Sequence, residues 1–98
     1  MNIQTNGVLH DTETSQIRQQ YDIRYSRKPL GNFETIGFER LYKTTDGGWW
    51  IHERYYRNGG GDQDTAAPLT EDKARAWLRD RFGRWKKFGR LEKRVFGG

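Results

Sequence analysis

The sequence contains no cysteine, which excludes disulfide bonds and thiolate metal sites. Histidine is nearly as scarce, because His10 and His52 are the only two and lie far apart in the chain. No apolar run approaches the roughly 18 residues that a membrane-spanning helix needs. Residues 1–15 have neither the basic start nor the apolar stretch of a signal peptide. We therefore expect a cytoplasmic protein that makes no membrane contact.

Catalytic motifs are also missing. The chain has no HExxH pair, no phosphate-cradling glycine motif and no nucleophile elbow. His52 and Glu53 are adjacent in a predicted strand, so they point to opposite faces and do not form one acid–base site. Asp62 and Asp64 do not complete a calcium loop. We expect a protein that is not an enzyme, with no catalytic residue, no metal and no cofactor.

The chain has 98 residues, 33 % of them hydrophobic and 14 % aromatic. This length allows one domain with a modest core, and a few large aromatic side chains can supply much of the buried area. Residues 1–16 are polar and predict a flexible arm, with a short strand near residues 7–10 or a helical turn at 15–20 as alternatives. Residues 17–98 predict a single folded domain.

Residues 33–57 predict a β-hairpin. Large side chains alternate with a period of two on either side of Asp46-Gly47, a dipeptide that favours a tight turn because glycine reaches positive φ. Tyr21–Arg27 alternates in the same way and ends before Pro29. These patterns predict a three-stranded antiparallel meander of about residues 21–27, 33–44 and 48–57. Residues 58–68 are rich in Gly and Asp and predict a mobile loop.

The C-terminal third predicts helices. Thr70 is a plausible N-cap, and apolar residues at helical spacing follow it over about residues 70–82. A second short basic helix is predicted over about 84–96, with Gly83 between the two. The fold class is therefore α+β, a βββα(α) domain. Its expected core is Ile23, Ile36, Phe38, Leu41, Ile51, Ala74, Trp77, Leu78 and Phe82.

Positive charge is concentrated at the C-terminal end. Residues 74–98 hold nine basic and two acidic residues, a formal charge of +7, whereas residues 1–73 carry −2, with nine basic and eleven acidic residues. Such an asymmetry indicates a polyanionic or acidic partner. Basic residues interleaved with aromatics can neutralise phosphates while the rings stack on bases. A core helix with a basic solvent face is the alternative interpretation.

The second predicted strand of the hairpin offers another contact surface. Its residues Trp50, Arg54 and Tyr56 share one face, and Trp49, Ile51 and Tyr55 share the other. The face that the helix leaves open either meets a partner or is covered by another part of the chain. The candidate residues for binding nucleic acid or a partner are Arg79, Arg84, Lys86, Lys87, Arg90, Arg94, Trp50, Arg54, Tyr56 and Trp85.

Three segments within residues 41–78 are Leu41-Tyr42-Lys43-Thr44, Gly47–His52 and Pro68–Leu78. Together they resemble a pattern of small bacterial proteins of unassigned function, in which a Leu-Tyr-basic-Thr strand and a Gly-aromatic-His strand precede an Ala-x-x-Trp-Leu helix. The resemblance implies the order strand, strand, helix, and it implies no activity. The basic extension after Leu78 departs from this pattern.

Two functional hypotheses follow. The first is a small binding protein that uses its basic, aromatic-rich C-terminal segment to bind nucleic acid or a nucleoprotein. The second is a phage- or plasmid-encoded inhibitor of a host defence complex, of the anti-CRISPR or anti-restriction type, which contacts an acidic protein surface.

Overall fold

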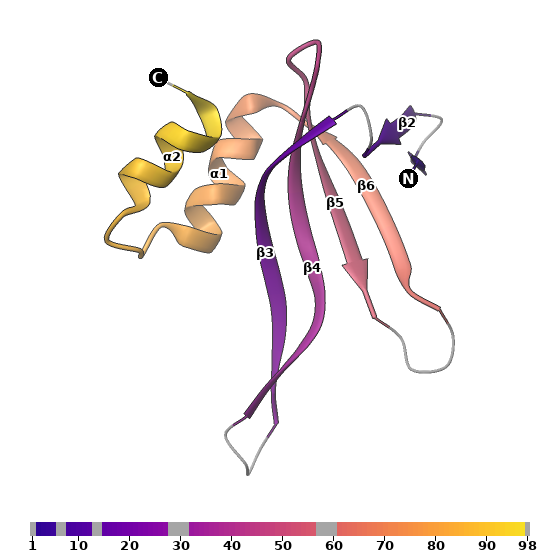
Figure 1. Cartoon of the computed structure of the whole chain (residues 1–98), viewed down its shortest axis with the longest axis vertical. Coiled ribbons are helices and arrows are strands. Elements are labelled where there is room, and N and C mark those ends of the chain that lie inside the picture. The colour runs from indigo at the N-terminus through magenta and orange to yellow at the C-terminus, as the bar shows by residue number, and fades with distance from the viewer. Residues whose placement is uncertain (1, 6–7, 13–14, 28–31, 57–60, 98) are drawn as a thin grey trace.

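The computed structural model describes residues 2–5, 8–12, 15–27, 32–56 and 61–97, and these form an α+β fold (Figure 1). Strands β3 (Ser15–Arg27), β4 (Asn32–Thr44), β5 (Trp49–Tyr55) and β6 (Gln63–Leu69) make an antiparallel sheet in chain order. Helices α1 (Glu71–Phe82) and α2 (Phe88–Phe96) follow. Over the described ranges, neither helix has the length and apolar character needed to cross a membrane.

The sheet has four strands where the sequence predicted three. The predicted loop 58–68 is wrong over its second half, because Gln63–Leu69 forms β6 and pairs with β5 from Tyr55↔Gln63 to Trp49↔Leu69. Residues 58–60 lie outside the described part of the chain. Pro68 is compatible with this strand because β6 is at the end of the four-stranded sheet, the position to which proline is mostly confined in sheets.

Within the predicted flexible arm, residues 1–16, the described residues form two short strands, of which the second corresponds to the strand predicted near residues 7–10. β1 (Asn2–Thr5) and β2 (Val8–Asp11) pair in a separate two-stranded sheet, and β1 lies beside β6. β3 begins at Ser15, well before the predicted residue 21, so residues 15–20 form no helical turn. A register shift between Ile17 and Gln19 interrupts the alternation in the first half of β3, which a period-two search therefore misses; a second shift, between Ile23 and Arg24, lies within the part that was predicted.

One face of the sheet packs against both helices. Its buried cluster joins the strands to α1 and α2 through Leu41, Trp49, Ala74, Trp77, Leu78, Leu91 and Val95. Glu39 of β4 is buried in the same layer and accepts hydrogen bonds from Trp77 Nε1 at 3.3 Å and from Arg81 Nε and Nη2 at 3.0 and 3.1 Å. These contacts fix α1 across β4.

The opposite face, called the second face below, holds its own aromatic cluster. Successive strand residues point to opposite sides, so Trp50 faces away from the helices that cover Trp49. The Trp50 ring stacks on Tyr42 at 4.3 Å, and both pack with Ala66 of β6. Phe38 belongs to this face, where its ring meets His52 edge-on at 5.2 Å. Of the other predicted core residues, Ile23, Ile36, Ile51 and Phe82 are only partly buried.

The ends of the helices explain how the C-terminal segment is arranged. Thr70 Oγ1 accepts a hydrogen bond from the Lys73 N–H at 3.2 Å, which confirms the predicted N-cap. Gly83 ends α1 as predicted. A Cβ there would lie 2.4 Å from the Arg79 carbonyl oxygen, which explains why this position holds a glycine. The second helix starts at Phe88 rather than at residue 84, so residues 84–87 form a turn between two helices that lie side by side (Figure 1).

Candidate functional site

The turn between α1 and α2 projects charged side chains outward. Its backbone is held by hydrogen bonds from the Trp85 N–H to the Phe82 carbonyl and from the Phe88 N–H to the Trp85 carbonyl, both 3.0 Å. Lys87 is the N-cap of α2 and makes no side-chain cap, and the first turn of α2 has no acidic residue. The positive end of the helix dipole is therefore surrounded by basic side chains, a local field that favours anions.

We define the basic patch as the cations of this turn and of the outer side of α2: Arg84, Lys86, Lys87, Arg90, Lys93 and Arg94. All six are exposed. Lys86, Lys87, Arg90 and Lys93 surround a shallow hollow beside Gly89. Arg94 donates from Nη2 to Gln19 Oε1 at 2.7 Å, a neutral partner that leaves its charge uncompensated.

The other C-terminal cations are paired with carboxylates. Arg75 lies 3.6 Å from Glu71, one turn earlier in α1, and Arg81 is held by Glu39 and Asp80. Arg79, a predicted binding residue, lies 3.8 Å from Glu92 across the two helices. Within the described residues, none of the six basic-patch cations makes such an ion pair. The structure thus distinguishes cations that lie beside a carboxylate from a cluster of cations that do not. Arg79 belongs to the cations beside a carboxylate.

Trp85 stands at the edge of the basic patch. Its side chain is 55 % exposed. Together with Lys87, Arg90, Leu91 and Arg94 it lines a second shallow hollow of about 190 Å³. Here the sequence prediction and the structure agree on a set of residues that lie together: Trp85, Lys87, Arg90 and Arg94.

The remaining predicted residues lie on the second face, on the other side of the sheet. Trp50 is 1 % exposed, so the hypothesis that it contacts a partner is wrong. It is buried because Tyr42 stacks on its ring and Ser15 Oγ accepts from its Nε1 at 3.1 Å. Tyr56 is 49 % exposed and packs edge-on against Phe38. These residues do not converge with the basic patch on one site.

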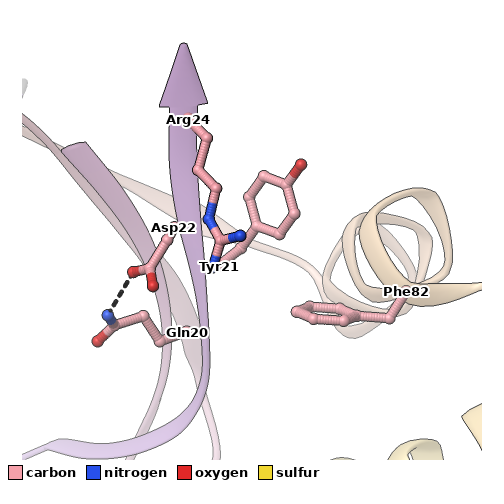
Figure 2. A pocket seen from close by; sticks show the side chains of 5 residues that line it. All are labelled: Gln20, Tyr21, Asp22, Arg24 and Phe82. Atoms are coloured by element: carbon pink, nitrogen blue, oxygen red, sulfur yellow. Dashed lines mark hydrogen bonds between the residues drawn. The ribbon is translucent and has the colours of Figure 1, made fainter. Parts of the chain in front are cut away.

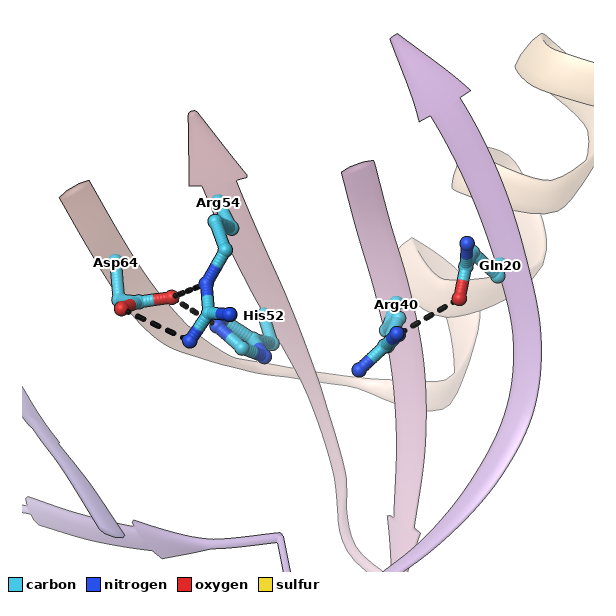
Figure 3. A network of polar contacts seen from close by, with 5 residues as sticks. All are labelled: Gln20, Arg40, His52, Arg54 and Asp64. Atoms are coloured by element: carbon cyan, nitrogen blue, oxygen red, sulfur yellow. Dashed lines mark hydrogen bonds and ion pairs between the residues drawn. The ribbon is translucent and has the colours of Figure 1, made fainter. Parts of the chain in front are cut away.

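Arg54 belongs to a polar network on the second face (Figure 3). Its Nε donates to Asp64 Oδ1 at 2.7 Å, and His52 Nε2 lies 2.7 Å from the same oxygen. The hydrogen bond from Arg54 holds the pKa of Asp64 below its ordinary value, and the bond to His52 adds to this effect. The network ties β5 to β6 and occupies Arg54 with a structural partner.

His52 is 1 % exposed and is the buried member of this network. Burial lowers its pKa, and the hydrogen bond to Asp64 offsets part of that effect. The Asp64 carboxylate accepts a hydrogen bond from Nε2, so the neutral His52 ring carries its proton on Nε2. Nδ1 is then a hydrogen-bond acceptor, and it has no partner among the described residues.

A further hollow lies between β3 and the end of α1. It is lined by Gln20, Tyr21, Asp22, Arg24 and Phe82, with Tyr21 and Phe82 edge-on at 5.7 Å (Figure 2). Asp22 accepts a hydrogen bond from Gln20 Nε2 at 2.8 Å. The negative charge of Asp22 and the positive charge of Arg24 offset each other, so this hollow offers a ligand no concentration of one charge.

Two basic residues were absent from the predicted set. Lys93 lies on the basic patch, three residues after Arg90, a spacing that places both on one side of a helix. Arg18 reaches α2 from β3, where its Nε and Nη2 donate to the carbonyl oxygens of Val95 at 2.9 Å and Arg94 at 2.6 Å. No sequence signal links Arg18 to α2, because the two segments are 76 residues apart.

Among the described residues no group of His, Asp or Glu side chains is arranged to hold a metal ion. Comparison with protein-family models, curated proteins and solved structures gives no match to this chain.

Proposed function

We propose that this protein binds nucleic acid through the basic patch. The observation that carries the proposal is the clustering of six exposed cations without an ion pair among the described residues. A phosphate backbone supplies a row of negative charges, and the release of its counterions drives association with such a cluster. Arginine adds planar donors that can bind a phosphate through two hydrogen bonds.

The arrangement of charge on the two helices supports this proposal over an ordinary solvated face. On α1 an acidic residue accompanies a basic one, as in Glu71 with Arg75. On α2, Arg90 and Arg94 are spaced at i,i+4, and Lys86 and Lys87 of the preceding turn add further positive charge nearby. A like-charge pair at i,i+4 destabilises a helix by about 0.2–0.5 kcal/mol. A repulsive cluster without a carboxylate partner among the described residues is better explained by an anionic partner.

The test is fluorescence anisotropy of labelled single-stranded and double-stranded oligonucleotides at low salt. The variant Lys86→Glu/Lys87→Glu should bind neither. The matched control, Arg24→Glu/Lys73→Glu, reverses two exposed cations outside the basic patch and should bind as the parent protein does. Lys73 occupies the third helical position after the Thr70 cap, where Glu favours the helix, so the control variant should remain folded.

Loss of binding in the first variant alone would support the proposal. Equal loss in both variants would show a response to net charge rather than to a site. Absence of binding by the parent protein, even at low salt, would overturn the proposal, and the basic patch would then be assigned to an acidic protein surface. That outcome would favour an inhibitor of a host complex, which capture of a defined host protein would test.

A further inference from the structure

Trp85 differs from the other three tryptophans in its surroundings. Trp49, Trp50 and Trp77 are 5 %, 1 % and 9 % exposed, whereas Trp85 is 55 % exposed. Each buried indole has a partner: Phe96 packs on Trp49, Tyr42 on Trp50 and Phe82 on Trp77. No ring, cation or hydrogen-bonding side chain contacts Trp85 within the described ranges. A large flat apolar surface is therefore left facing solvent.

The backbone of Trp85 is nevertheless held in the turn. Its backbone N–H bonds to the Phe82 carbonyl and its carbonyl accepts from the Phe88 N–H, and these bonds fix the direction in which the side chain leaves the chain. Leu91, which is 4 % exposed, lies at the base of the same hollow. The hollow is open and mostly apolar at its floor, with Lys87, Arg90 and Arg94 as its polar rim. An aromatic surface next to three cations suits a ligand that is both flat and anionic.

We propose that Trp85 is a stacking platform for an unpaired nucleobase, while Lys87, Arg90 and Arg94 contact the phosphates on either side. This inference rests on the proposed function and names its substrate class, single-stranded nucleic acid. In a duplex the faces of the bases are covered by their neighbours, so a duplex offers phosphates to the rim and no base to the indole. Stacking on an aromatic residue is tolerant of sequence because every base has a π-face. The protein therefore binds single strands more tightly than duplexes, with little preference among bases.

The experiment compares Trp85→Ala, Trp85→Leu and Trp85→Phe with the parent protein in anisotropy titrations on a single-stranded oligonucleotide and on its duplex. Trp85→Ala should weaken single-strand binding by about 5- to 160-fold, which is the range that base–aromatic stacking supplies. Duplex binding should stay within about twofold. Trp85→Phe should recover part of the loss, and Trp85→Leu, which restores apolar area without a π-system, should recover less. Thermal unfolding of each variant checks that the fold is kept.

A second arm uses the same oligonucleotide with abasic positions, which keeps the phosphates and removes the bases. The parent protein should lose affinity for this ligand, and Trp85→Ala should bind both oligonucleotides alike. Equal effects of Trp85→Ala on single strands and duplexes would overturn the stacking assignment. So would unchanged single-strand binding in Trp85→Ala while Lys86→Glu/Lys87→Glu still abolishes it, and that result would leave the proposed function standing. A parent protein that binds neither ligand overturns both.

Discussion

The basic patch predicts a measurable dependence of binding on salt. Each phosphate neutralised on a single strand contributes about −0.7 to the slope of log K against log salt concentration. If all six basic-patch cations contact phosphates, the slope is about −4.2, and affinity falls about 340-fold between 50 and 200 mM salt. Replacing Lys86 and Lys87 with Gln removes two of these contacts. The slope should then be about −2.8, and the same salt change should cost about 50-fold.

The assay is an anisotropy titration of one single-stranded oligonucleotide at four or more salt concentrations. Lys86→Gln/Lys87→Gln is compared with Arg24→Gln/Lys73→Gln, which removes the same charge from exposed positions on β3 and α1. Because counterion release counts contacts and not net charge, the control should keep the parent slope. A common decrease in slope for both double variants would refute the reasoning. A parent slope shallower than about −1 would show that the clustered cations do not act together on phosphates.

Three other predictions concern the fold. Gly89→Ala should stabilise the protein by up to about 1 kcal/mol, because a Cβ there meets open space, and a thermal midpoint no higher than the parent's would contradict this. Glu39→Gln should cost about 2 kcal/mol in urea unfolding, because the half-buried Arg81 loses its buried charged partner, and an unchanged midpoint would show that the pair contributes nothing. His52→Gln should flatten the fall in stability between about pH 7 and pH 5. The folded pKa of His52 is lowered by burial, so as the pH falls below about 6.5 the unfolded chain takes up this proton before the folded protein does, and the parent protein loses stability. Equal urea midpoints against pH in both proteins would exclude this role for His52.

The elements with local signals were predictable. The Asp46-Gly47 turn forms as its residues require, with Gly47 at φ 91° and its N–H bonded to the Thr44 carbonyl at 3.1 Å. α1 lies within one residue of its predicted start because Thr70 caps it. In both cases the deciding interaction lies within a few residues of sequence, so the pattern alone is enough.

β6 and the first half of β3 were not predictable in this way. β6 contains two alanines and Pro68, which have low strand propensity, and its pairing with β5 supplies the order that its own sequence does not. Five of the six residues of β3 from Ser15 to Gln20 are polar and its pairing has two register shifts, yet β4 provides a partner of equal length, thirteen residues. Tertiary pairing therefore overrides local composition in both strands.

In the candidate site too, some features follow from local sequence and others depend on tertiary contacts. Composition is enough to locate the excess of positive charge, but not to say which cations are free. Only the pair Glu71 with Arg75 has a spacing that sequence can reveal. Arg81 pairs with Glu39, which lies 42 residues away in the sequence, and Arg79 pairs with Glu92 on the neighbouring helix. The same limit applies to aromatics, since Trp50 and Trp85 were both predicted to contact a partner, yet Trp50 is buried and Trp85 is exposed.

The basic patch depends on contacts that lie outside it. α2 has nine residues, and isolated helices shorter than about 12–15 residues are marginal in water. Repulsion among its cations makes the helix weaker still. Burial of Leu91 and Val95 opposes this, at about 1.5–3 kcal/mol for each side chain. Arg18 adds two hydrogen bonds to the carbonyl groups at the end of α2, where a positive charge also favours the helix dipole. The core and β3 thus hold in place a helix whose exposed side carries uncompensated positive charge, because the contacts that oppose the repulsion come mainly from Leu91, Val95 and Arg18.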